Sequence, residues 1–217
     1  AIEKGATVIE TNRNGKKVDF YISNKCIDYT EAQLDRSIVS PKQIRLNLEE
    51  FKKSIYTDLF PERKVSWNYI PKTLIFAKDD HHATEIVNIL KEVFGENFDD
   101  NIVPEKFVQK ITYSAGDTDA LIREFRINKE FRIAVTVTLV ATGTDVKPLE
   151  VVFFMRDVNS DVLYTQMKGR GCRVISDDKL REVTPNATTK DCYYIVDAIG
   201  VTETNSKSRK WKEWTEE

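Results

Sequence analysis

The residues with the clearest chemical potential lie in the segment Gln166–Arg173, which reads QMKGRGCR. If residues 163–172 form a helix, Gln166, Arg170 and Arg173 stand at positions i, i+4 and i+7, on one face of that helix. Two guanidinium groups and an amide on one face make a good receptor for a polyphosphate, because arginine stays charged and presents a planar fork of donors to phosphate oxygens. The alternative is a solvated basic helix with a bend at its glycines.

Two glycines, Gly169 and Gly171, flank Arg170. Each weakens a helix by about 1 kcal/mol relative to alanine. That cost is easiest to understand where another backbone or a ligand comes close. The glycines therefore favour a binding role for the segment.

A second candidate is the loop that contains Thr142, Gly143 and Asp145, directly after an apolar run. Gly143 permits a backbone conformation that exposes N–H groups to a phosphate. Asp145 can accept a hydrogen bond from a ribose hydroxyl or orient a nearby arginine. Taken alone, an ordinary turn in which a side chain bonds its own backbone explains such a loop equally well.

From residue 72 onward, short apolar runs alternate with amphipathic stretches. The pattern predicts strands over residues 73–77, 108–113, 131–139, 151–155 and 193–198. Five strands that alternate with helices indicate an α/β fold with a parallel sheet covered on both faces. In such sheets ligands bind at the carboxyl ends of the strands, so we expect the motifs to gather at that edge.

The chain ends predict smaller appendages. Residues 6–23 read as a β-hairpin that turns at Asn14-Gly15, and residues 35–56 read as a helix with Pro41 in its first turn. The basic and aromatic tail is a frayed helix or a nucleic-acid contact. We therefore predict a hairpin extension over residues 1–27, one domain over residues 28–201 and a polar tail over residues 202–217.

The composition excludes several classes of protein. Lys and Arg number 33 against 35 Asp and Glu, so affinity for nucleic acid cannot come from a broad basic surface. No apolar run approaches the ~20 residues of a bilayer span. Three cysteines without CxxC spacing favour reduced thiols in a cytoplasmic protein. The adjacent pair His81-His82 lacks metal-ligand spacing, and we expect it at a helix start near the capping groups Asp79 and Asp80.

The two candidate motifs together resemble motifs V and VI of superfamily-two helicases and translocases: Thr142-Gly143-x-Asp145, then Gln166-x-x-Gly169-Arg170-x-x-Arg173. The run KTLIFA at residues 72–77 resembles motif IV, and TYSAGD at 112–117 resembles the segment between motifs IV and V. The sequences KTLIFAKDDHHATEIVNIL and YTQMKGRGCR are similar to segments of the motor (R) subunit of type I restriction enzymes. The similarity extends over most of residues 28–201. The resemblance implies a RecA-like, P-loop NTPase-like three-layer sandwich with a mostly parallel sheet, the second such domain of the motor.

The resemblance also implies roles for single residues. Arg170 and Arg173 match the arginines that reach the ATP γ-phosphate from the second domain, as arginine fingers do. Gln166 matches the residue that senses nucleotide, and Gly143 and Asp145 match the motif that couples nucleotide to strand contacts. Four positions match places where the family touches the DNA backbone: Lys78, Ser114, Gly116 and Thr142.

The partners follow from the same resemblance. They are double-stranded DNA, upstream nuclease and first RecA-like domains of the same polypeptide, and separate specificity and methylation subunits, with no membrane. ATP and Mg²⁺ would be held mainly by the first domain, because this sequence has no GxxxxGK[ST] loop and no Asp-Glu motif at a strand end. We therefore expect no ATP turnover and no nuclease activity from the chain alone. Its start without Met is consistent with a piece of a larger protein.

Two alternatives remain at the level of sequence. The same motifs can be relics in a catalytically inert interaction module of a larger nucleic-acid-processing assembly. A free-standing mononucleotide-binding protein is disfavoured, because no glycine-rich loop follows the first strand of the predicted sheet.

Overall fold

The computed structural model describes residues 41–112, 117–138, 145–158 and 161–198, and the backbone of three short strands before residue 40. These strands are β1 (Thr7–Thr11), β2 (Lys17–Ile22) and β3 (Ile38–Val39). They form an antiparallel sheet in the order β2-β1-β3.

The predicted hairpin is confirmed, because β1 and β2 pair in antiparallel register with Thr7 opposite Ile22. Its Asn14-Gly15 turn lies outside the described residues. The domain boundaries at residues 27 and 201 stay predictions.

A second sheet forms the body of the molecule and consists of five parallel strands in the order β5-β6-β4-β7-β8. The strands are β4 (Thr73–Phe76), β5 (Val108–Lys110), β6 (Ile133–Thr136), β7 (Val151–Phe154) and β8 (Tyr194–Asp197). All five strands predicted from the apolar runs are present, each shorter than its run. The central strand β4 aligns its first residue, Thr73, with Ile133 of β6 and Val151 of β7.

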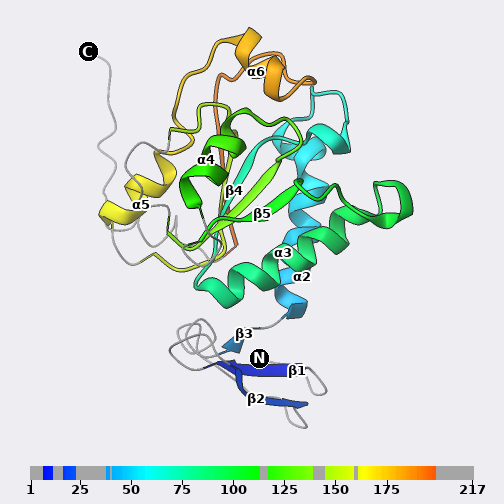
Figure 1. Cartoon of the computed structure of the whole chain (residues 1–217), viewed down its shortest axis with the longest axis vertical. Helices are drawn as coiled ribbons and strands as arrows, with labels where there is room; N and C mark the ends of the chain where they lie inside the picture. The colour runs from blue at the N-terminus through cyan, green and yellow to red at the C-terminus, as the bar shows by residue number, and fades with distance from the viewer. Residues whose placement is uncertain are drawn as a thin grey trace, which may run out of the picture.

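Helices cover both faces of this sheet (Figure 1). They are α2 (Pro41–Ser54), α3 (Asp80–Gly95), α4 (Thr118–Ile127), α5 (Asp161–Lys168) and α6 (Asp177–Val183). Shorter turns are the π-helical η1 (Ile55–Leu59) and the 3-10 helices η2 (Trp67–Tyr69) and η3 (Asp99–Asn101). Within the described ranges, no helix has the length and apolar character that crossing a bilayer requires.

The core consists of two apolar layers, one on each side of the sheet. Alternate strand residues such as Ile75 and Phe153 pack with α2 and α3. Their neighbours Phe76 and Phe154 pack with α4 and α5 on the other face. Because successive side chains of a strand point to opposite faces, a strand buried on both faces must be apolar throughout. The three-layer α/β architecture implied by the resemblance is thereby confirmed.

The helix starts follow capping rules, with one correction. Pro41 opens α2, where its missing N–H costs nothing. The prediction that the helix begins at residue 35 is wrong: β3 pairs with β1 at Ile38–Val39, and the residue before a proline avoids helical geometry. Asp79 caps α3 by accepting from the backbone amide of His82 at 2.8 Å, as expected. The short helix α6 was not predicted.

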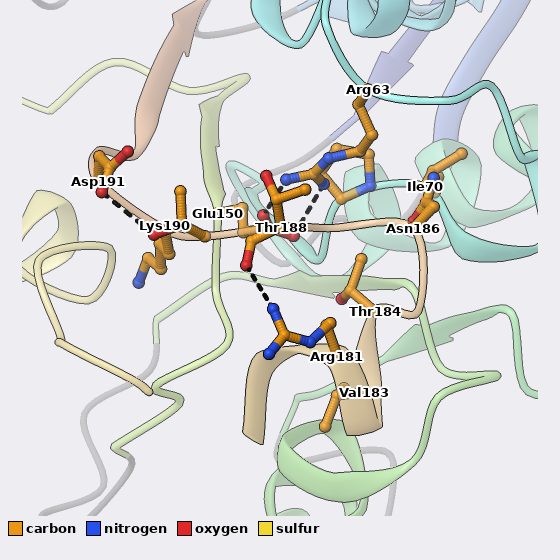
Figure 2. Close-up of polar contacts among 12 residues, drawn as sticks. Arg63, Ile70, Glu150, Arg181, Val183, Thr184, Asn186, Thr188, Lys190 and Asp191 are labelled. Atoms are coloured by element: carbon orange, nitrogen blue, oxygen red, sulfur yellow. Dashed lines mark hydrogen bonds and ion pairs between the residues drawn. The ribbon is translucent and has the colours of Figure 1, made fainter. Parts of the chain in front are cut away.

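Charged side chains close the edge of the sheet where the strands begin. Lys72, Arg132 and Glu150 each stand directly before a strand, and all three are buried. Arg132 donates to the carbonyl oxygens of Ile70 and Val183. Glu150 accepts from Arg63 at 2.7 Å, in a buried ion pair (Figure 2). These charges therefore hold the amino-end edge together instead of facing solvent.

Candidate functional site

The segment with the two arginines is a helix end followed by a turn. The predicted helix over residues 163–172 is wrong beyond Lys168, where α5 ends. The amide of Arg170 donates to the carbonyl of Met167 at 3.2 Å, and that of Gly171 to Lys168 at 3.1 Å. These i-to-i−3 bonds tighten the chain, as is common at helix C-termini. Residues 169–173, which we call the arginine turn, therefore do not continue the helix face of Gln166.

Asp145 contacts this turn across the chain. Its Oδ1 lies 3.2 Å from Nε of Arg173, although the geometry is that of an ion pair and not of a hydrogen bond. The two side chains are 39% and 62% exposed, so the pair contributes at most about 1 kcal/mol to stability. The ion pair is informative because it shows that residues from the two predicted motifs lie next to each other.

Arg170 is half-buried next to the same pair. Burial lowers the pKa of its guanidinium below the ordinary value, and the charge of Arg173 lowers it further, whereas Asp145 acts in the opposite direction. The repulsion between the two positive charges raises the electrostatic free energy of the isolated chain. An anion bound between them would relieve that cost.

Of the remaining predicted residues near the nucleotide, only Gln166 is described by the structure. Gln166 is exposed on the last turn of α5. Gly143 and Thr142 lie outside the described residues. The structure therefore brings together Asp145, Arg170 and Arg173 out of the predicted set.

The glycines of the arginine turn are explained by close approach, but the neighbour belongs to this chain. A Cβ atom at Gly171 would lie 2.1 Å from Cδ2 of Tyr193. A Cβ at Gly169 would lie 3.0 Å from the carbonyl oxygen of Thr165. We expected a backbone or a ligand at these positions, and at Gly171 the structure has an aromatic ring instead.

A residue that sequence reasoning missed, Lys190, bonds the turn through its side chain. Nζ of Lys190 donates to the carbonyl oxygens of Lys147, Gly171 and Arg173, at 2.9, 2.9 and 2.8 Å. Burial lowers the pKa of this ammonium group. A lysine in a polar segment between α6 and β8 carries no sequence signal for such a role.

Lys78, the one predicted DNA contact within the described residues, lies at the opposite edge of the sheet, where the strands end. Lys78 follows β4, and its backbone amide donates to Nδ1 of His82 at 3.3 Å. Nearby, Asp80 accepts from Oγ1 of Thr112 at 2.6 Å and from Nζ of Lys110 at 2.9 Å, which ties the start of α3 to the end of β5.

Ser114 and Gly116, the other two DNA positions after β5, lie outside the described residues. His82 itself is buried, and burial lowers its pKa from 6.5 to about 4. Its neutral ring therefore accepts the Lys78 amide throughout the physiological pH range.

The expectation that all motifs meet at the carboxyl ends of the strands is wrong for the arginine turn. Its partners Lys147, Lys190 and Tyr193 precede β7 and β8, so they lie toward the amino ends of these parallel strands. The reason is the direction of α5, which starts after the carboxyl end of β7 and runs back along the sheet (Figure 1). The arginines therefore come after the helix has returned.

Comparisons with known proteins agree with the resemblance. No protein-family model matches the chain. Over 185 residues, or 80% of the chain, it is 29% identical to the endonuclease subunit of the type I restriction enzyme EcoKI from Escherichia coli strain K12. Over 167 residues, or 76% of the chain, it is 27% identical to the endonuclease subunit of EcoAI from Escherichia coli. The aligned chain spans only 14% and 18% of the length of these two relatives.

A solved structure similar to the chain is the Hef helicase domain of Pyrococcus furiosus. The match covers 80% of this chain and 29% of that one, with 18% identity and a TM-score of 0.44. At that score the likeness adds nothing to the topology described above.

Proposed function

The chain is homologous to a segment of the endonuclease subunits of type I restriction enzymes, and from this relationship we propose that it is the second motor domain of an ATP-dependent DNA translocase in such an enzyme. One observation carries the proposal: Asp145 and the arginine turn, which come from two motifs far apart in sequence, lie together, with 3.2 Å between Asp145 and Arg173. A half-buried Arg170 next to Arg173 on one turn fits an anion-binding site better than a plain solvated surface.

The chemistry that this arrangement supports is charge stabilisation. Arg170 and Arg173 present two guanidinium groups on one turn, and Asp145 orients the second of them. Such groups stabilise the negative charge that develops on a phosphoryl group during transfer. Gln166 at the exposed end of α5 would report whether nucleotide is present, and the backbone around Gly143 would approach it.

The arrangement is half of a nucleotide site. The sequence has no phosphate loop, and within the described residues no three His, Cys, Asp or Glu side chains form a group that could hold a metal. The residues fit the outer phosphate of ATP and do not fit Mg²⁺. We therefore assign Mg²⁺ and most of the ATP contacts to a first RecA-like domain, which would bring its face against the arginine turn.

The proposed DNA contacts are Lys78, Ser114, Gly116 and Thr142. The 33 basic residues are balanced by 35 acidic ones, so the net charge of −2 gives no overall attraction to the phosphate backbone. Binding of the chain to double-stranded DNA should be weak and should fall steeply with salt. Site recognition and methylation would belong to other subunits of the complex.

The test is ATP turnover in a protein that joins this chain to a first RecA-like domain. Arg170→Ala should lower the DNA-stimulated turnover number by about 10³-fold or more, the scale of arginine fingers. Arg123→Ala is the matched control, since Arg123 is an exposed arginine on α4 and its loss should leave turnover unchanged. Normal turnover in Arg170→Ala would refute the catalytic role and favour the inert interaction module.

A further inference from the structure

The side chain of Lys190 makes an unusual set of bonds for a lysine. Its ammonium group has three donors, and each one reaches a backbone carbonyl: Lys147 at 2.9 Å, Gly171 at 2.9 Å and Arg173 at 2.8 Å. The carbonyls belong to two segments that are otherwise separate in the chain. One lies two residues after Asp145, and the other is the arginine turn.

The setting of Lys190 indicates that these bonds are a fixed part of the structure. The residue lies on the extended segment between α6 and β8 (Figure 2). Burial lowers its pKa, and the charge of Glu150 is the largest influence in the opposite direction. A charge that is partly removed from water needs hydrogen bonds that compensate for the lost hydration, and the three carbonyls provide them.

The same segment contacts the arginine turn a second time. Three residues after Lys190, the ring of Tyr193 fills the space where a side chain at position 171 would lie. The strand that follows is fixed, because the amide of Tyr194 donates to the carbonyl of Glu150 at 2.9 Å. The turn therefore contacts both an ammonium group that also bonds Lys147 and a ring that directly precedes β8.

We propose that Lys190 is a positioning residue that sets the placement of the arginine turn relative to Asp145. This inference rests on the proposed function, since it concerns the same half-site. The Arg173–Asp145 contact is exposed and weak by itself, so it cannot fix the turn. Lys190 bonds the carbonyl of Arg173 and the segment after Asp145 at once, and that double attachment fixes their separation.

The test compares Lys190→Met and Lys190→Arg in the protein that joins this chain to a first RecA-like domain. Lys190→Met keeps a stem of four heavy atoms and removes the ammonium group with its donors. Because a misplacement of about 1 Å can cost 10²-fold in rate, we expect the turnover number to fall by 10- to 100-fold, with the KM for ATP changed by less than about 3-fold. Lys190→Arg should recover part of the loss, since its guanidinium still donates to carbonyls.

A control and a second readout separate positioning from simple stabilisation. Lys179→Met replaces an exposed lysine on α6 and should match the parent in every measurement. In NMR spectra of the 217-residue chain, Lys190→Met should shift the Arg173 Nε–Hε signal, and Lys179→Met should not. A Lys190→Met protein with an unchanged Arg173 signal and normal turnover per folded molecule would overturn the inference.

The outcomes also distinguish this inference from the proposed function. Loss of turnover in Arg170→Ala together with normal turnover in Lys190→Met refutes the positioning role and leaves the motor role intact. Normal turnover in Arg170→Ala refutes the motor role itself. If Lys190→Met does not fold, Lys190→Gln decides, because its shorter, uncharged side chain cannot reach all three carbonyls. A lowered turnover number with an intact fold and a shifted Arg173 signal supports positioning, and parent-like values for both overturn it.

Discussion

Replacing Gly171 by alanine tests the packing of the arginine turn directly. The added Cβ would lie 2.1 Å from Cδ2, 2.6 Å from Cγ and 2.7 Å from Cε2 of Tyr193. Carbon atoms that are not bonded prefer a separation of about 3.5 Å or more, so the turn and the ring must move apart by about 1.4 Å. Tyr193 precedes a strand that is paired with β7. We therefore expect the turn to take most of the movement.

The size of the effect follows from that displacement. Forcing a methyl group into a filled space typically costs 1–3 kcal/mol, so Gly171→Ala should lower the free energy of unfolding of the chain by about 2 kcal/mol. The displacement is also larger than the ~1 Å that can cost 10²-fold in rate. In the protein joined to a first RecA-like domain, turnover should fall by about 100-fold.

The assay is a double-mutant cycle with Tyr193→Ala. Chemical denaturation gives the free energies of unfolding, and steady-state ATP turnover gives the rates. Removing the ring makes room for the Cβ, so Gly171→Ala should cost less than about 0.5 kcal/mol in the Tyr193→Ala background, which is a coupling energy above about 1 kcal/mol. Val174→Ala is the control, because that neighbouring side chain is 84% exposed.

Two results would refute the reasoning. The first is a Gly171→Ala protein with the parent's stability and turnover, which would mean that the ring does not confine the turn. The second is an equal cost of Gly171→Ala in both backgrounds. That would place the strain somewhere other than at Tyr193.

Two further predictions concern buried ionisable groups. Burial lowers the pKa of His82 from 6.5 to about 4. Between pH 6.5 and 4 the unfolded chain therefore binds a proton that the folded chain does not. The free energy of unfolding should fall by up to about 3 kcal/mol as the pH drops through this range. His82→Phe should remove that part of the pH dependence in denaturation curves, and an unchanged slope would contradict it. Glu150→Gln leaves the buried Arg63 without the negative charge that pairs with it and should lower the free energy of unfolding by about 3 kcal/mol. The exposed control Glu182→Gln should change it by less than about 0.5 kcal/mol. Equal values for the two variants would refute the role of the pair.

The strands were predictable because their physical signal is local. A strand buried on both faces must be apolar at every position, and runs such as that of β7 have this property in the sequence itself. The cap at Asp79 was predictable for the same reason, since a carboxylate just before a helix accepts one of its free amides. The meeting of Asp145 with the arginines followed from the resemblance to known motifs and not from their spacing.

The end of α5 was not predictable from periodicity. Gln166, Arg170 and Arg173 keep helical spacing in the sequence, yet the helix ends at Lys168. Tertiary contacts decide the outcome: Tyr193 packs on Gly171 and Lys190 bonds two carbonyls of the turn. Together these contacts hold residues 169–173 as a turn.

The burial of the charged residues at the amino-end edge of the sheet was equally unpredictable from the sequence. Lys72 and Glu150 read as residues of ordinary surface type, and in sequence nothing separates them from exposed ones. In the structure they are buried, and Lys72 donates to the carbonyl of Asn128 at 2.8 Å. Only the fold brings the partners that make such burial possible.

The sequence by itself determined the type of sheet and the kinds of side chain that would do the chemistry, because hydrophobic patterning and guanidinium chemistry are properties of short segments. The tertiary structure decided where that chemistry lies. It placed the arginine turn toward the amino ends of β7 and β8, away from Lys78. There Lys190 and Tyr193 contact the turn and position it. The physical reason is that these contacts join residues 17 or more positions apart through side chains of common types, and the residues meet only when the layers of the fold pack together.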